Sequence, residues 1–204
     1  NEFAMISEEL KIDVWEAIKL ANLHPRVEIL KPGPGVGGHC IAIDPWFLTE
    51  ATLNAQLIQT ARRINDGMPN YTLLLTKQLI GDKLTFPTIT VLGVSYKGNI
   101  DDARETPALK FINLAQKQGI TVKIHDPLNV EFEGGPLLPL EEAVENSDVI
   151  VLITNHDIFL DIDPAKIGPL MNHKYLLDTR NHLDHKAWKK AGFKIKVLGN
   201  NKQK

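Results

Sequence analysis

Short apolar segments recur through residues 83–204, and helical segments separate them. The longest of them, such as DVIVLIT, carry no polar–apolar alternation, so each is predicted to be a strand covered on both faces. Strands joined through helices run parallel and form a sheet with helices packed on both sides. The five segments are TITVLGVSY (88–96), TVKIHD (121–126), DVIVLIT (148–154), KYLLD (174–178) and FKIKVLG (193–199). This part of the chain is therefore predicted to be a doubly wound α/β domain, which binds ligands beyond the carboxyl ends of its strands.

Helices between these strands are predicted from local signals. Thr106 is a good N-cap and Pro107 suits a first helical position, which predicts a helix over 108–119 that ends near a glycine. Shorter helices are predicted over 140–146 and 186–191. Repeated strand–helix–strand order of this kind is typical of a Rossmann-like domain.

The first 82 residues differ, because their apolar residues recur at helical spacing. One helix is predicted over 2–10, and Asp13 is a suitable N-cap for a second helix that ends near Asn22. Residues 25–45 are rich in proline and glycine and are predicted to form an ordered loop. Further helices are predicted over 47–65 and 69–80.

The change of pattern between Gly81 and Pro87 is the predicted domain boundary. We therefore expect two parts, a central helical region over 1–82 and a Rossmann-like parallel-sheet domain over 83–204.

Composition excludes several classes of function. The 23 basic and 25 acidic residues give a net charge of −2, which argues against a generally basic nucleic-acid surface. No apolar run reaches membrane-spanning length, so no membrane partner is expected. One cysteine in 204 residues excludes an intramolecular disulfide and fits a reducing, cytoplasmic setting. No spacing of cysteine and histidine resembles a metal site, so no metal is expected.

The stretch KPGPGVGGHCIAIDPWF (31–47) holds that only cysteine, Cys40. Gly35, Gly37 and Gly38 precede it and permit the close backbone approaches that a main-chain ligand cradle needs. A thiolate at Cys40 can attack a carbonyl, and a carboxylate at Asp44, one helical turn away, can orient or deprotonate a water. The alternative is a buried, unreactive cysteine, which is a common fate of a free thiol.

Basic residues follow the first and fourth strands of the predicted sheet. Lys97 and Arg104 lie near the predicted helix N-terminus and could form an anion site, although this segment alone favours their pairing with neighbouring acids. Arg180, at a strand's carboxyl end, has few structural reasons to be there. His156, after the third strand, is interpreted as a satisfied polar residue. No GxGxxG fingerprint is present.

Longer motifs in both parts resemble one enzyme family. GPGVGGHCIAIDPWF, preceded by ANLHPRV and followed by ARRINDGMP, resembles the UDP-glucose/GDP-mannose dehydrogenase family of sugar-nucleotide 6-dehydrogenases. VSYKGNIDDARETP and LLDTRNHLD match its C-terminal domain. The resemblance implies oxidation of the sugar C6 alcohol to a carboxylate by two hydride transfers to NAD. Cys40 would hold the aldehyde as a thiohemiacetal and then a thioester, and Asp44 would assist the hydrolytic water.

The resemblance also implies binding roles. Lys97 and Arg180 would contact the nucleotide of a UDP-sugar, and Arg104 would lie near the NAD pyrophosphate. Arg26 would reach the sugar nucleotide of the neighbouring subunit in a homodimer formed through the central helices. The loop residues Gly35, Val36, Gly37 and Gly38 would surround the sugar.

The motifs favour UDP-N-acetyl-D-mannosamine as the substrate, with UDP-N-acetylglucosamine or UDP-glucose as alternatives. Family members begin with an NAD-binding domain, and their oxyanion-stabilising lysine and asparagine would fall upstream of Asn1. We therefore expect the chain to be a C-terminal portion that binds UDP-sugar weakly or not at all alone and does not turn over. A non-catalytic nucleotide-binding or dimerisation module, with a structural Cys40, is the alternative of another class.

Overall fold

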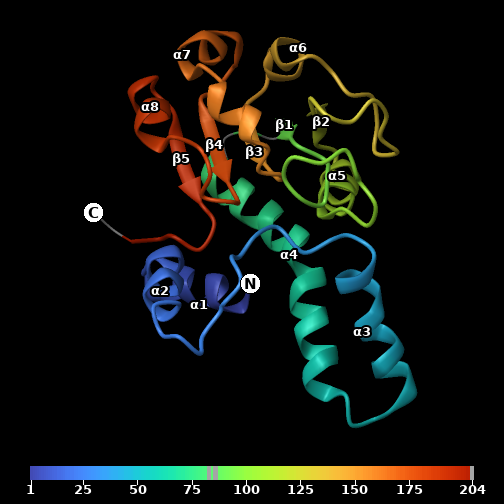
Figure 1. Cartoon of the computed structure of the whole chain (residues 1–204). Helices are drawn as coiled ribbons and strands as arrows, with labels where there is room; N and C mark the ends of the chain where they lie inside the picture. The colour runs from blue at the N-terminus through green and yellow to red at the C-terminus, as the bar shows by residue number, and fades with distance from the viewer. Residues whose placement is uncertain (82–83, 85–86, 203–204) are drawn as a thin grey trace.

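The computed structural model describes residues 1–81, 84 and 87–202. Five parallel strands form one sheet in the order β2-β1-β3-β4-β5, which confirms the predicted doubly wound α/β fold (Figure 1). The strands are β1 (Thr88–Leu92), β2 (Thr121–His125), β3 (Val149–Leu152), β4 (Tyr175–Asp178) and β5 (Lys194–Val197). Because the order reverses between β1 and β3, their carboxyl ends flank a switch point of the kind where ligands bind.

The two faces of the sheet pack into two apolar cores. Val149 and Val151 of β3 enter the core under the N-terminal helices, whereas Ile150 and Leu152 enter the opposite core. Every residue of β3 is fully buried, as expected for a central parallel strand. The elements over the second core are α6 (Leu140–Val144), the 3-10 turn η1 (Asp157–Asp161), α7 (Pro164–Ile167), η2 (Gly168–Leu170) and α8 (His185–Lys190).

Helix α5 (Pro107–Lys117) starts where its capping signal predicted. The Thr106 hydroxyl oxygen accepts a hydrogen bond from the Ala108 N–H, and Pro107 is the first helical residue. Gly119, just beyond the helix, has a φ of 74°, which glycine adopts without strain. This helix fixes the segment between Leu92 and Thr106, which carries two of the candidate site residues.

The N-terminal part is helical, as predicted. Its helices are α1 (Glu2–Leu10), α2 (Val14–Ala21), α3 (Cys40–Ala51) and α4 (Gln56–Ile80). The Asp13 carboxylate caps α2 by accepting from the N–H groups of Trp15 and Glu16. No helix among the described residues is long and apolar enough to cross a membrane.

Three predicted boundaries in this part are wrong. The loop predicted over 25–45 ends where α3 begins at Cys40, because α3 tolerates Pro45 in its interior. The helix predicted over 47–65 is interrupted between Ala51 and Gln56. The helix predicted over 69–80 is the second half of α4, which continues through the buried Pro69. The apolar residues that follow Pro69 pack into the core, and this burial offsets one lost hydrogen bond.

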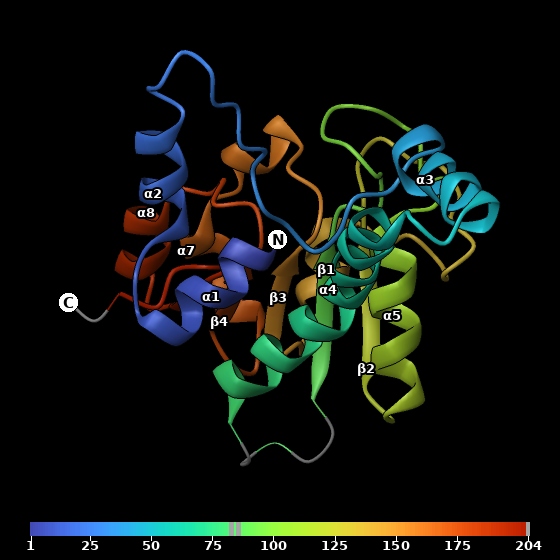
Figure 2. The ribbon, with the colours of Figure 1, turned by 90° about the horizontal axis from the view of Figure 1, so that it is seen from below.

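Helix α4 joins the two parts of the molecule. It contacts α3 at one end and α5 and strands β3 to β5 along its length, and it crosses one face of the sheet (Figure 2). The predicted boundary between residues 82 and 83 lies outside the described residues.

Helices α1 and α2 are tied to the end of β5. The Val14 N–H donates to the Gly199 carbonyl at 2.9 Å, and the Trp15 indole Nε1 donates to the Leu198 carbonyl at 2.8 Å. The buried Glu8 carboxylate accepts from the Gly199 N–H at 3.0 Å. These bonds bring the first helices against the C-terminal segment.

Candidate functional site

The glycine-rich loop is buried against the sheet domain. A Cβ at Gly37 would overlap the Glu105 carbonyl oxygen and lie 2.9 Å from the Tyr96 Cβ. Gly38, with a φ of +85°, lies against the Tyr96 ring, and its N–H donates to the Arg104 carbonyl at 3.1 Å. The glycines therefore allow a close approach, as their presence predicted, and the surface they approach is the segment that follows β1.

Two asparagines hold the same loop from the other side. The Asn65 side chain, on α4, accepts from the Val36 N–H at 2.9 Å and donates to the Val36 carbonyl at 3.3 Å. The Asn1 side chain donates to Asn65 Oδ1 at 3.1 Å and accepts from the Gly33 N–H at 2.9 Å. The loop therefore has little freedom before it reaches Cys40.

Cys40 and Asp44 share the first turns of α3, so the predicted spacing of one helical turn is confirmed. Both side chains are exposed, which contradicts the alternative of a buried cysteine. They line a cavity of about 700 Å³ whose other walls are apolar. The remaining lining residues are Ile41, Pro45, Phe47, Leu48 and Ile58. A nucleophile and a carboxylate thus meet beside an apolar surface.

Arg180 follows β4 and packs under the glycine-rich loop. Its Nε donates to the Ile153 carbonyl at 2.8 Å, and its guanidinium lies against Gly33. Burial lowers the pKa of Arg180 to about 10, with Asp178 acting in the opposite direction, so the side chain stays charged at neutral pH. No carboxylate among the described residues pairs with it.

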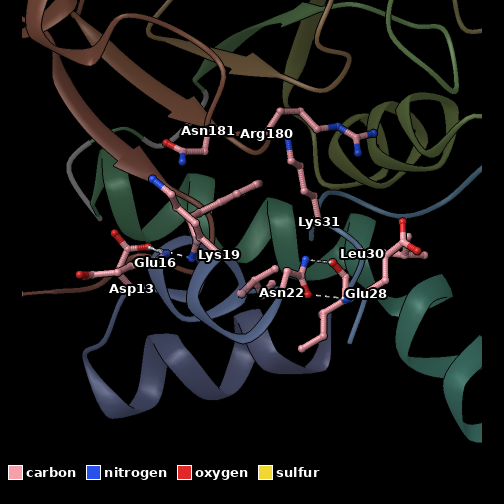
Figure 3. A pocket seen from close by; sticks show the side chains of 12 residues that line it. Asp13, Glu16, Lys19, Asn22, Glu28, Leu30, Lys31, Arg180 and Asn181 are labelled. Carbon is pink, nitrogen blue, oxygen red and sulfur yellow. Dashed lines mark hydrogen bonds between the residues drawn. The ribbon is translucent and has the colours of Figure 1, made fainter. Parts of the chain in front are cut away.

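Arg180 also lines a cavity of about 850 Å³ between α2, the 28–31 segment and the sheet edge (Figure 3). Lys19 and Lys31 add positive charge to this cavity, whereas Asp13, Glu16 and Glu28 add negative charge away from Arg180, with which none of them forms an ion pair. A half-buried cation without a carboxylate partner, open to such a cavity, suits an anionic ligand. Cys40 and Arg180 line different cavities, so the structure does not bring all the candidate residues into one pocket.

The remaining basic candidates lie on exposed loops. Arg104 pairs with Asp102, with 2.5 Å between Nη2 and Oδ2, and this hydrogen bond lowers the pKa of the Asp102 carboxyl. The predicted pairing of Arg104 with a neighbouring acid is confirmed. Lys97 and Arg26 are both exposed.

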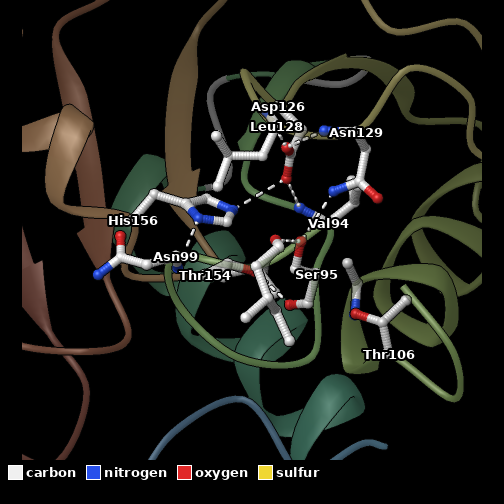
Figure 4. A network of polar contacts seen from close by, with 12 residues as sticks. Val94, Ser95, Asn99, Thr106, Asp126, Leu128, Asn129, Thr154 and His156 are labelled. Carbon is white, nitrogen blue, oxygen red and sulfur yellow. Dashed lines mark hydrogen bonds and ion pairs between the residues drawn. The ribbon is translucent and has the colours of Figure 1, made fainter. Parts of the chain in front are cut away.

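A buried network that sequence reasoning missed supports the Lys97 loop (Figure 4). The Asp126 carboxylate accepts from the Val94 N–H at 2.7 Å and from His156 Nε2 at 3.1 Å. His156 Nδ1 accepts from the Asn99 N–H at 2.9 Å, which assigns the proton to Nε2. Asp126 thereby ties together the ends of β1, β2 and β3, and His156 is the satisfied polar residue that the sequence indicated.

Asp178, two residues before Arg180, is a second buried aspartate that accepts several hydrogen bonds. Its carboxylate accepts from the N–H groups of Arg180, His182 and Leu183, and from His185 Nε2. Burial alone would raise the pKa of Asp178, but these hydrogen bonds, led by His185, hold it below its ordinary value. Asp126 directly follows β2 and Asp178 is the last residue of β4, and this position at a strand's carboxyl end was the available sequence signal.

No group of three or more histidine, cysteine, aspartate or glutamate side chains among residues 1–81, 84 and 87–202 could hold a metal ion.

The fold and the loop define a doubly wound α/β protein whose helical arm carries an exposed thiol. Two family models match it: the central domain of the UDP-glucose/GDP-mannose dehydrogenase family over residues 1–67, and the UDP binding domain of that family over residues 90–185. The chain belongs to the UDP-glucose/GDP-mannose dehydrogenase family.

Individual proteins and solved structures of this family are similar to most of the chain. The chain is 49% identical over 205 residues to the UDP-N-acetyl-D-mannosamine dehydrogenase of Methanocaldococcus jannaschii, covering 99% of this chain and 47% of that protein. The UDP-D-ManNAc dehydrogenase structure from Pyrococcus horikoshii matches with a TM-score of 0.86 at 38% identity, over 99% of this chain and 48% of that one. An NDP-N-acetyl-D-galactosaminuronic acid dehydrogenase structure from Methanosarcina mazei matches with a TM-score of 0.88 at 26% identity. The match covers 98% of this chain and 47% of that one. The chain spans about half the length of the curated relatives that it matches.

Proposed function

We propose that this chain is the C-terminal portion of an NAD-dependent UDP-N-acetyl-D-mannosamine 6-dehydrogenase. The observation that carries the proposal is the exposed pair Cys40 and Asp44, one turn apart beside a single cavity, at the end of a loop held by the sheet domain. Support for the substrate comes from relatives of that name at 48% and 49% identity. The lone, unpaired cysteine agrees with a cytoplasmic enzyme.

In this proposal Cys40 keeps the substrate bound between two oxidations. The thiolate sulfur adds to the C6 aldehyde carbon, and the carbonyl oxygen takes up a proton, giving a thiohemiacetal. Loss of hydride from that carbon and of the proton from its hydroxyl leaves a thioester. Water then attacks the thioester carbon, Asp44 accepts the water's proton, and the carbon–sulfur bond breaks to release the carboxylate and regenerate Cys40.

NAD would supply the hydride acceptor for both oxidations. The described residues do not fit a complete dinucleotide cradle, because the turn after β1 lacks the glycine fingerprint. We therefore assign only Arg104 as a contact near the NAD pyrophosphate and derive no step of the hydride transfer from this chain.

The nucleotide of the UDP-sugar is proposed to bind at the carboxyl edge of the sheet. Arg180 is charged, has no carboxylate partner in the part of the chain that the structure describes, and lines a cavity, which supports its role as a nucleotide contact. Lys97 would approach from the loop after β1, and the segment Gly35–Gly38 would surround the sugar. Residues 83–204 would form this nucleotide-binding domain.

Residues 1–82 are proposed to form the central dimerisation region. Several large apolar side chains on its helices are exposed, which supports a subunit interface. They include Phe3, Leu10, Ile41, Phe47 and Leu57. In the homodimer, the exposed Arg26 would reach the sugar nucleotide of the neighbouring subunit.

Oxidation of UDP-N-acetylglucosamine or UDP-glucose is the alternative within the family, since such sugars differ by few pocket contacts. The enzyme that joins this chain to an NAD-binding domain should be assayed with the three UDP-sugars and NAD. We expect UDP-N-acetyl-D-mannosamine to have the highest kcat/KM. We expect the 204-residue chain alone to form no NADH. Ordinary turnover by the chain alone would exclude the proposal that it is a portion of the enzyme.

A non-catalytic nucleotide-binding or dimerisation module is the alternative of another class. In that case the enzyme that carries this chain would oxidise none of the three sugars, and Cys40 would be dispensable.

A further inference from the structure

We propose that Arg62 and Asn65, one turn apart on α4, are positioning residues that hold the main chain on both sides of Cys40. This inference rests on the proposed function, because it concerns the placement of the proposed nucleophile. Neither side chain touches the thiol. Each acts on the backbone that carries it.

The first contact fills a gap left by a proline. Pro45 has no N–H, so the Ile41 carbonyl, four residues earlier in α3, receives no helical hydrogen bond. The Arg62 Nη1 donates to this carbonyl at 3.2 Å, and the Arg62 Nη2 donates to Asp66 Oδ1 at 2.8 Å. The first turn of α3 therefore depends on a guanidinium from another helix.

Arg62 occupies an environment that does not favour a cation. Only 7% of the residue is exposed, and its Nε is buried without a hydrogen-bond partner among the described residues. A buried guanidinium with an unmatched donor is costly, whereas an exposed position on the same helix is available to the adjacent Arg63. Two contacts compensate this cost: the ion pair with Asp66, and the bond to the carbonyl that Pro45 leaves free.

The second contact lies on the other side of the thiol. Asn65 pairs with both backbone groups of Val36, at 2.9 Å and 3.3 Å, in the manner of a neighbouring strand. Only four residues, from Gly37 to Cys40, separate the backbone groups that Asn65 and Arg62 hold. Both ends of this short span are thus fixed to one rigid helix.

Apolar packing supplies only part of what holds α3 in place. Ala42 is the only fully buried residue of Cys40–Ala51, and Ile43, Pro45 and Trp46 are half-buried. The position of its first turn therefore rests mainly on polar contacts, and their loss is expected to release the thiol without unfolding the sheet domain.

Cys40 offers a direct probe, because it is the only cysteine in 204 residues. A trifluoromethyl thiol reagent labels it in the full chain, and the 19F resonance reports its mobility. The wild type and the control Arg63→Met are expected to give one resonance with the same chemical shift and linewidth. Arg62→Met and Asn65→Ala are expected to move it toward the shift of the unfolded chain and to change its linewidth, and Arg62→Lys, which keeps a donor, is expected to restore it in part.

A milder variant keeps the test decisive if either of these variants fails to fold. Asn65→Asp retains the acceptor for the Val36 N–H and removes the Nδ2 donor, which contacts the Val36 carbonyl at 3.3 Å and Asp66 Oδ1 at 3.4 Å. Folding is checked by circular dichroism on every variant. Folded Arg62→Met and Asn65→Asp proteins whose resonance has the chemical shift and linewidth of the wild type would overturn the proposal.

Kinetics of the enzyme that carries this chain separate positioning from substrate binding. Arg62→Met is expected to lower kcat by about 10- to 100-fold, with KM for the UDP-sugar nearly unchanged. A mobile label with an unchanged kcat would overturn the proposal. If the wild-type enzyme oxidises no UDP-sugar, the proposed function fails, and the 19F measurement alone still decides whether these residues position Cys40.

Discussion

Gly37 of the glycine-rich loop lies directly against Glu105, at the turn that precedes α5. A Cβ at Gly37 would overlap the Glu105 carbonyl oxygen and lie 2.9 Å from the Tyr96 Cβ. The Gly37 φ lies outside the left-handed region, so space rather than backbone conformation requires glycine here. This contact joins the thiol-bearing loop to the segment that carries Lys97 and Arg104.

We therefore expect Gly37→Ala to push the two segments apart. The free energy of unfolding should fall by about 1–3 kcal/mol, the usual cost of overpacking, and turnover of UDP-sugar should fall with it. Gly67→Ala is the matched control, because Gly67 lies within α4 and a Cβ there meets nothing within 4 Å. It should leave stability unchanged or raise it by up to about 1 kcal/mol. Urea unfolding of both variants checks this, and equal effects would contradict it.

Arg180 should contribute strongly to nucleotide affinity. It is charged and lacks a carboxylate partner among the described residues, so a UDP phosphate would supply the missing anion. Arg180→Met should weaken UDP binding by roughly 10- to 100-fold, the value of one charge-assisted hydrogen bond, and Arg180→Lys should restore part of it. Calorimetric titration of the enzyme with UDP measures this. Affinity equal to that of an Arg63→Met control would exclude Arg180 from the site.

Cys40 should be alkylated readily in the folded protein. Its side chain is exposed at the start of α3, so iodoacetamide needs no unfolding step to reach it. The rate at neutral pH should change little when urea is added, and bound UDP-sugar should slow it in the intact enzyme. A thiol that reacts only after denaturation would remove the nucleophile assignment.

Asp126 should make stability depend on pH in acid. Burial would raise the pKa of this carboxyl, but hydrogen bonds from His156, Val94 and Asn129 hold it well below the ordinary value of 3.8. A depressed folded-state pKa contributes stability above the unfolded value, and that contribution is lost as pH falls toward the folded value. The wild type should therefore lose stability as pH falls below 3.8.

The variant Asp126→Asn isolates this effect. It should lower the free energy of unfolding at neutral pH by about 1–3 kcal/mol, because buried donors lose their acceptor. The difference in free energy of unfolding between Asp126→Asn and the wild type should become smaller below about pH 4. Denaturant unfolding at both pH values tests this, with the exposed Asp101→Asn as a control. A difference that stays constant with pH would contradict the role of the ionised carboxylate.

Much of the sheet domain could be predicted because its signals are local. Buried strands such as Val149–Leu152 are apolar throughout, and Thr106 with Pro107 marks a helix start without reference to distant residues. The turns over 157–170 were missed, although Asp163 caps α7 and Pro164 opens it, which are the same signals on a shorter scale.

The thiol-bearing segment could not be predicted as fully, because distant residues determine it. Pro45 indicated a loop, and α3 forms through it since Arg62, 21 residues after Ile41, supplies the missing hydrogen bond. The glycines predicted a close approach, but Tyr96 and Glu105 are the neighbours only once the fold brings them there. The role of Cys40 came from the resemblance of a whole motif, since one cysteine near one aspartate is weak evidence by itself.

The most direct test of the proposed function is the amount of NADH formed per UDP-N-acetyl-D-mannosamine consumed by the enzyme that joins this chain to an NAD-binding domain. Two NADH and one uronate per sugar are predicted for the wild type, because Cys40 holds the aldehyde between the oxidations. Cys40→Ala, shown to be folded and to bind UDP, is predicted to form no uronate. A folded Cys40→Ala enzyme that still yields two NADH and the uronate would contradict the account.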